Sequence, residues 1–143
     1  MASMPFWMKA IAMLERGQVV RFFYLWKRQA DAGEESGRKA RPVCIVIRTP
    51  DNPGRVFLFP ITSQQPDANR LSLAIPQIEC RRAGLAFPCW LILDEFNRVD
   101  LDKAYDFEDT RPIGTLSPAF LVRVAKTIKQ AAEAHRISSV LRT

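Results

Sequence analysis

The residues best suited to bind a charged ligand are basic and are concentrated in the first third of the chain. They are Arg21, Lys27, Arg28, Arg38, Lys39, Arg41, Arg48 and Arg55. With a formal net charge of +6 and a pI near 9.7, the chain suits a polyanion such as nucleic acid, or an acidic partner protein, because basic surface attracts both. Among these residues Arg41 stands between a glycine-containing loop and an apolar run beginning at Pro42, which gives its charged tip a rigid base.

A guanidinium in such a position suits a phosphate group, because its planar fork pairs with two phosphate oxygens and stays charged. Thr62 follows the end of another apolar run, where its hydroxyl is placed to bond a phosphoryl oxygen. Each residue also has an ordinary structural interpretation. Arg41 suits an exposed strand edge or an ion pair with Glu34 or Glu35, and Thr62 suits a turn in which it bonds its own backbone. Residue types alone leave these alternatives open.

The cysteine and histidine residues do not have the spacing of a metal site. Cys44, Cys80 and Cys89 form no CxxC pair, and the only histidine, His135, lies far down the chain. A structural zinc site needs about four Cys or His ligands at close spacing. We therefore expect free, partly buried thiols in a reducing compartment, no metal and no cofactor. His135 falls at the end of the last predicted helix, and we do not expect it to be catalytic.

The elements that must position these groups are short strands followed by one helix. Apolar, β-branched and aromatic runs predict strands over 18–26, 42–48, 55–61, 71–78 and 89–93. Pro76 makes the fourth of these an edge strand. Glycine and polar residues mark 27–39 as an exposed loop and 51–54 as a turn.

The last third of the chain changes to a helical pattern. Ser117-Pro118 is typical of a helix start, and apolar residues recur at helical spacing from Phe120 to Ala132. Short strands followed by one amphipathic helix predict a mainly β fold with appended helices (α+β), in the form of a small barrel. The N-terminus lacks the basic region and cleavage site of a signal peptide, and no run approaches the ~20 apolar residues of a membrane span. We expect no membrane association and a cytoplasmic location.

Several short motifs follow one another in a fixed order. They are Gly17-Gln18-Val19-Val20, Arg41-Pro42-Val43, Pro60-Ile61-Thr62-Ser63, Gly84-Leu85, Leu91-Ile92-Leu93-Asp94-Glu95 and Ile113-Gly114-Thr115-Leu116-Ser117. Any one of them occurs often by chance. Together, from about Gly17 to Ala132, they resemble the PemK/MazF family of toxin endoribonucleases.

The resemblance implies an SH3-like small β-barrel of the CcdB/MazF/Kid type with a C-terminal amphipathic helix. This domain is expected over 17–143, preceded by a tail or short helix over 1–16. The resemblance also implies the toxin of a type II toxin–antitoxin system. Such a toxin is a homodimer that cuts single-stranded RNA selectively without a metal, and an acidic antitoxin protein binds its RNA groove.

In metal-free RNA cleavage the ribose 2′-hydroxyl attacks its own 3′-phosphate. The enzyme must take a proton, stabilise charge at phosphorus and protonate the leaving 5′-oxygen. The resemblance implies Arg41 for the phosphate charge, Thr62 for a phosphoryl oxygen, and Glu35 as base or as the group that orients Arg41. The residues expected to bind RNA are Ser63, Asp94, Lys39, Arg38, Phe96, an aromatic near Asp94 that could stack on a base, and Arg98.

The chain departs from the family pattern at two acidic positions and in one insertion. The family's loop acid lies five positions before the Arg of Arg-Pro, where this chain has Ser36, so either Glu34 or Glu35 takes its place. The family's Asp-Gln is Asp94-Glu95, and an acidic insertion spans about 100–110. The alternative is a non-catalytic binding module of the same fold, either a gyrase poison of the CcdB type or a degenerate toxin homologue. Arg41 and Thr62, which the RNA-cleaving branch requires, favour cleavage.

Overall fold

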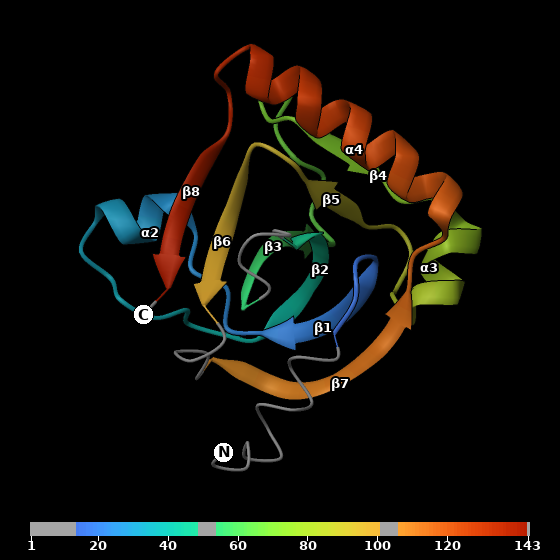
Figure 1. The fold of residues 1–143 in the computed structure, drawn as a ribbon, viewed down its shortest axis with the longest axis horizontal. Helices are drawn as coiled ribbons and strands as arrows, with labels where there is room; N and C mark the ends of the chain where they lie inside the picture. Colours follow the sequence, from blue (N-terminus) through green and yellow to red (C-terminus); the bar gives the residue numbers. More distant parts are fainter. Residues whose placement is uncertain (1–13, 49–53, 101–105, 143) are drawn as a thin grey trace.

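The computed structural model describes residues 14–48, 54–100 and 106–142, which form a curved, mainly antiparallel sheet flanked by helices (Figure 1). The strands are β1 (Gln18–Phe22), β2 (Arg41–Arg48), β3 (Arg55–Thr62), β4 (Ser72–Ala74), β5 (Trp90–Ile92), β6 (Glu95–Asp100), β7 (Phe107–Thr115) and β8 (Ser138–Arg142). The helices are α2 (Lys27–Asp31), α3 (Gln77–Ala83) and α4 (Pro118–Glu133).

The strands pair in the order β4–β5–β3–β2–β1–β7, while β6 pairs with both β3 and β8. The β6–β8 pair is parallel and the other pairs are antiparallel. Among the described strands this path ends at β4 and β7, so the sheet curves strongly but its hydrogen bonding does not close into a barrel (Figure 1). The predicted class, mainly β with appended helices, is confirmed.

Two apolar clusters on the two faces of β2 and β3 form the core. One contains Val20, Phe22, Val43, Ile45 and Leu58, and the other contains Val19, Cys44, Phe59, Phe120 and Val124. Because successive residues of β2 alternate between the clusters, the continuous apolar run is explained by a strand buried on both faces. Each fully buried side chain of this kind stabilises the fold by about 1.5–3 kcal/mol.

All five predicted strands are present, but β5 is one residue shorter at each end than predicted and two others are much shorter. The first ends at Phe22, and the following segment leads into α2 inside the predicted loop. The predicted edge strand ends at Ala74, and Pro76 is the N-cap of α3. The turn predicted at 51–54 and the tail or short helix predicted at 1–16 lie mostly outside the described residues.

Two of the short motifs that lie far apart in the sequence meet where α3 ends against β7. Gly84 ends α3 with a φ of 71°, a conformation that favours glycine. A Cβ atom on Gly84 would lie 2.7 Å from the Ile113 carbonyl oxygen, and one on Gly114 would lie 2.4 Å from the Ala83 carbonyl carbon. Only glycine at both positions allows the two backbones to approach this closely.

The start of α4 is tied to α3 by a buried carboxylate. Ser117 is the N-cap, and its hydroxyl accepts a hydrogen bond from the Phe120 amide at 3.2 Å. Glu79 of α3 accepts from the Ser117 amide at 2.8 Å and from the Ser117 hydroxyl at 2.6 Å. Burial alone would raise the pKa of Glu79, but these bonds outweigh it and hold the pKa below its usual value.

We predict that Glu79→Ala lowers the free energy of unfolding by about 2 kcal/mol, because two buried donors of Ser117 lose a charged acceptor. The folded-state pKa of Glu79 is depressed, so its contribution is complete above the unfolded value of about 4.3 and is lost as pH falls through the folded value. The difference in unfolding free energy between wild type and Glu79→Ala should therefore become smaller in acid. Urea unfolding at several pH values measures it, with the exposed Glu133→Ala as control. Equal stability of the two variants at pH 7 would contradict the prediction.

Candidate functional site

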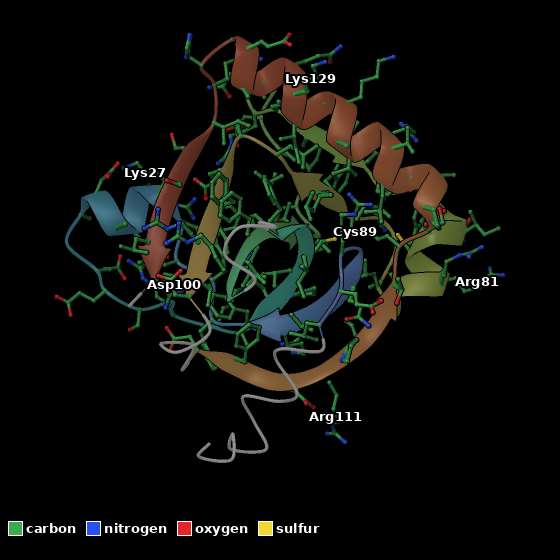
Figure 2. The ribbon with its side chains drawn as sticks, in the orientation of Figure 1. Lys27, Arg81, Cys89, Asp100, Arg111 and Lys129 are labelled. Carbon is green, nitrogen blue, oxygen red and sulfur yellow. The ribbon has the colours of Figure 1, made fainter. Side chains whose placement is uncertain are left out.

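A cavity of about 570 Å³ opens between the start of β2, the loop after β3 and the loop before β5. Its polar lining includes Trp26, Arg28, Lys39, Arg41, Thr62, Ser63, Gln64, Gln65, Asp67 and Arg70. Four of these residues are cationic and, among the described lining residues, one is a carboxylate. Other basic side chains, such as Arg81 on α3 and Lys129 on α4, point outward into solvent (Figure 2). The cavity therefore concentrates positive charge in a recess, where a polyanion would be partly desolvated.

Arg41 contributes a charge to this cavity that no carboxylate neutralises within the described structure. Its Nε atom is buried and has no hydrogen-bond partner there. Glu34, one of its possible ion-pair partners, is bound instead by Arg38, through two hydrogen bonds of 2.8 Å. Burial, and then the nearby Arg28 charge, lower the pKa of Arg41. An unpaired, partly buried guanidinium is suited to an anionic ligand.

Trp26 holds the arginines of the cavity together. The guanidinium carbons of Arg28, Arg41 and Arg70 lie 5.1, 4.9 and 5.8 Å from the centre of its ring. A cation over an indole face is stabilised by about 0.5–2 kcal/mol, depending on how far it is desolvated. The indole therefore offsets part of the repulsion between three like charges and fixes their direction.

The segment that carries Trp26 is held by side chains of β6 and β8. Asn97, whose side chain is completely buried, accepts from the Leu25 amide at 2.9 Å and donates to the Leu25 carbonyl at 2.8 Å. Arg142 donates to the Phe23 carbonyl at 2.8 Å and to the Asn97 side chain at 3.0 Å, and it pairs with Asp106. Backbone groups that the end of β1 leaves without a strand partner are satisfied in this way.

Asp94 and Glu95, which do not line the cavity, hold the side chain of Arg70 in place at the cavity. Asp94 accepts two hydrogen bonds from Arg70, from Nε at 3.0 Å and from Nη2 at 2.7 Å, and a third from the Leu71 amide at 3.1 Å. Glu95 Oε2 lies 3.7 Å from Arg70 Nη2. Burial alone would lower the pKa of Arg70, but the Asp94 hydrogen bonds and both negative charges outweigh it and raise the pKa.

Glu95 itself is a buried carboxylate in an enclosed network. The Tyr24 hydroxyl donates to it at 3.3 Å and the Lys27 amide donates to it at 3.3 Å. Burial raises the pKa of Glu95, although Arg70 opposes the change. Burial and the adjacent Glu95 also raise the pKa of Tyr24 well above its usual value. Both groups are therefore occupied in supporting the cavity wall.

Thr62 and Ser63 lie at the mouth of the cavity, where β3 ends. Thr62 Oγ1 accepts a hydrogen bond from the Gln64 amide at 3.1 Å, so part of its role is to shape the turn, as one of the two interpretations expected. A hydroxyl that accepts one bond still has its proton to donate. The backbone bond fixes the position of Oγ1 without using this donor, so both interpretations of Thr62 are compatible with the structure.

The structure brings together some of the predicted residues and not others. Arg41, Lys39, Thr62 and Ser63 line the cavity, while Asp94 lies behind it. The remaining predicted residues, Glu35, Arg38, Phe96 and Arg98, are not among its lining residues.

These four residues lie in different parts of the fold. Glu35 is exposed in the loop before β2, and Arg38 is occupied by Glu34. Phe96 is half-buried and stacks on Phe57 at a centroid distance of 4.5 Å against the core, and Arg98 is half-buried on β6. Their predicted roles in RNA binding and catalysis therefore gain no support from proximity to the cavity.

Sequence reasoning did not select Trp26 or Arg70 as site residues. Trp26 ends an aromatic run that was interpreted as a strand, and Arg70 stands in a polar stretch without a motif. Arg28 belongs to the basic group of the first third, but nothing in its spacing indicated that it faces Arg41. Only the contact with Trp26 relates the three arginines.

Comparison with family models identifies residues 16–132 as a PemK-like, MazF-like toxin of a type II toxin–antitoxin system. The chain belongs to this family. Among solved structures, the crystal structure of MazE–MazF (Form-II) from Deinococcus radiodurans matches this chain with a TM-score of 0.54 at 13% sequence identity. The match covers 87% of this chain and 97% of that chain, and at this identity it shows the shared fold. No curated protein matches the sequence significantly.

The described residues of this PemK/MazF-family chain bear on metal binding and on membrane insertion. They contain no group of three or more His, Cys, Asp or Glu side chains arranged to hold a metal ion. No helix in the same part of the chain is both long enough and apolar enough to cross a membrane.

We predict that Asn97→Ala lowers the free energy of unfolding by about 3 kcal/mol, because it leaves the buried amide and carbonyl of Leu25 without partners. Arg142 also loses an acceptor. Urea denaturation measures the change, with the exposed Gln130→Ala as control. A loss below about 0.5 kcal/mol, the range of ordinary surface changes, would mean that Asn97 does not hold this segment.

Proposed function

We propose that this chain is a metal-independent endoribonuclease that cuts single-stranded RNA as the toxin of a type II toxin–antitoxin pair. The observation that carries the proposal is the unpaired Arg41 guanidinium, which lies in a cavity that three other cations and Thr62 also line. Membership of the PemK/MazF family supports the same function.

The chemistry needs one phosphate held close to fixed cationic donors. As the ribose 2′-oxygen bonds to phosphorus, negative charge builds on the two non-bridging oxygens. Arg41 supplies a forked donor for these oxygens, and Thr62 supplies a hydroxyl proton. Both start from rigid strand ends of β2 and β3, so little reorganisation is needed as the charge develops.

The shape of the site suits an unpaired strand better than a duplex. A cavity of about 570 Å³ is in the range that holds a small ligand, such as one unstacked nucleotide. Sequence-specific RNA recognition mostly uses bases that are free of a duplex, because the major groove of an RNA helix is too narrow for side chains. Lys39 and Arg28, which line the same cavity, supply positive charge for the neighbouring phosphates.

We predict that Arg41→Ala lowers the rate of RNA cleavage in EDTA by about 10²–10³-fold, the usual loss for a donor to developing negative charge. Gel analysis of a long single-stranded RNA measures the rate, and the wild-type fragments should end in 2′,3′-cyclic phosphate. Arg41→Lys should recover little of the activity, because lysine keeps the charge but not the fork. Arg81→Ala on the outer face of α3 is the matched control and should cut at the wild-type rate.

The alternative is a binding module of the same fold. The exposed position of Glu35, outside the cavity, is the observation that favours it. Folded wild-type protein that binds RNA but leaves it intact in EDTA would support the alternative and rule out the endoribonuclease. A gyrase supercoiling assay would then be the next measurement.

The partner we propose is an acidic antitoxin whose extended segment enters the same cavity. The solved relative is described as a complex, MazE–MazF, and the excess of cations over carboxylates in the cavity suits an acidic peptide. We predict that poly-glutamate competes with RNA for wild-type protein and that Arg41→Ala weakens both ligands. Competition measured by fluorescence anisotropy tests this. Poly-glutamate that binds without displacing RNA would contradict a shared cavity.

We further propose that the toxin is a homodimer that acts in the cytoplasm, where its messenger RNA substrate is found. Apolar side chains exposed at Ile78, Ile113 and Val122 give a second copy a surface to cover. Light scattering should give a mass of twice 16.3 kDa. A mass of 16.3 kDa at micromolar concentration would rule the dimer out.

A further inference from the structure

The cavity contains a carboxylate to which no motif drew attention. Resting on the proposed ribonuclease function, we propose that Asp67 is the general base that takes the proton from the ribose 2′-hydroxyl. Among the described residues that line the cavity, Asp67 is the only acid. Within the described structure its carboxylate has neither an ion pair nor a hydrogen-bond partner, so its oxygens are free to accept a proton.

The other acidic side chains near the cavity either bind another group or do not line the cavity. Asp94 is held by Arg70, and Glu95 accepts from Tyr24 and the Lys27 amide. Glu34 binds Arg38, while Glu35, the acid expected from the resemblance, does not line the cavity. The base therefore has to come from another element, and the loop after β3 supplies one.

The loop that carries Asp67 is held firmly from both sides. The Arg70 amide donates to the Asp67 carbonyl at 2.9 Å, which closes a four-residue turn. Asp94 fixes the Arg70 side chain, and Arg136 donates to the Asn69 carbonyl at 3.1 Å. The turn thus sets Asp67 and Arg70 together at the cavity, which the start of β2 also lines.

The charges around Asp67 come from three parts of the chain. Arg28 lies on α2, Lys39 and Arg41 lie at the start of β2, and Arg70 ends the turn itself. In this proposal the cations hold the phosphate, and Asp67 accepts the proton from the sugar of the same nucleotide. A single carboxylate beside four cations, among the described lining residues, would orient the substrate with its phosphate toward Arg41 and its 2′-hydroxyl toward Asp67.

The step is balanced without a metal or a co-reactant. The proton of the 2′-hydroxyl passes to Asp67 as the 2′-oxygen bonds to phosphorus. The bond from phosphorus to the 5′-oxygen breaks, and that oxygen takes a proton from water. The products are a 2′,3′-cyclic phosphate and a 5′-hydroxyl end, and Asp67 returns its proton to solvent.

The test uses the full chain and single-turnover cleavage of a single-stranded RNA in EDTA. We predict that Asp67→Asn lowers the cleavage rate by about 10²-fold or more while RNA affinity changes by less than about threefold. Asparagine keeps the turn, because it is favoured at the first position of a turn, but it cannot accept the proton. Glu133→Gln on the exposed face of α4 is the control, and the melting temperature of each variant checks its fold.

A second variant separates proton transfer from structure. We predict that added formate restores at least about tenfold of the activity lost in Asp67→Ala, because a small carboxylate can act as the missing base in the emptied space. Formate should not restore Arg41→Ala. A merely structural role for Asp67 would give no rescue.

The outcomes distinguish the two proposals. Wild-type protein that cuts RNA, with Asp67→Asn still active and Glu35→Gln inactive, would overturn the assignment of Asp67 and leave the endoribonuclease standing. Wild-type protein that cuts no RNA would overturn the proposed function itself.

Discussion

The cavity depends on a side chain that replaces a missing strand. After Phe22 the chain leaves the sheet, and Leu25 has no neighbouring strand with which to pair. Asn97, completely buried on β6, bonds both the amide and the carbonyl of Leu25 and in turn accepts from Arg142. An unpaired buried backbone group costs about 1–3 kcal/mol, so this arrangement strongly favours one path for the segment. That path places the Trp26 ring beside Arg28, Arg41 and Arg70, and so positions the cations of the proposed site.

The elements predicted most easily from the sequence were those whose pattern of burial is the same along their whole length. β2 and β3 are continuous apolar runs because both their faces are buried, and α4 has a clear N-cap and an apolar stripe. β6 was not predicted, because it turns Glu95 and Asn97 inward, so its buried face reads as polar. β7 is charged and contains Pro112, and β8 is short. The strands that were not predicted lack an apolar strand pattern of their own, and it is pairing with neighbouring strands that makes them part of the sheet.

The same limit explains which site residues could be found. Arg41 and Thr62 stand directly at ends of predicted strands, so sequence position fixed their surroundings and the structure places both at the cavity. Glu35 was predicted as a site residue by analogy with the family's loop acid, but its spacing from Arg41 differs from the family's. The length of a loop decides where a side chain on it lies. Asp67 and Arg70 lie in a polar stretch, where only contacts with Asp94 and Arg136, both distant in sequence, bring them to the cavity.

Arg70 and Arg41 differ in whether a carboxylate neutralises their charge, and this indicates different roles for them. Arg70 is neutralised by Asp94, so it adds rigidity and a donor edge but little net charge. Arg41 has no such partner within the described structure: Glu34, the ion-pair partner considered for it, is bound to Arg38, and the nearby Arg28 adds repulsion. Like charges gathered in a recess are unfavourable until an anion joins them, and Trp26 offsets only part of that cost. A phosphate that neutralises Arg41 would relieve this repulsion, so in the proposed function the residue that binds the polyanion is also the one that stabilises charge at the reacting phosphate.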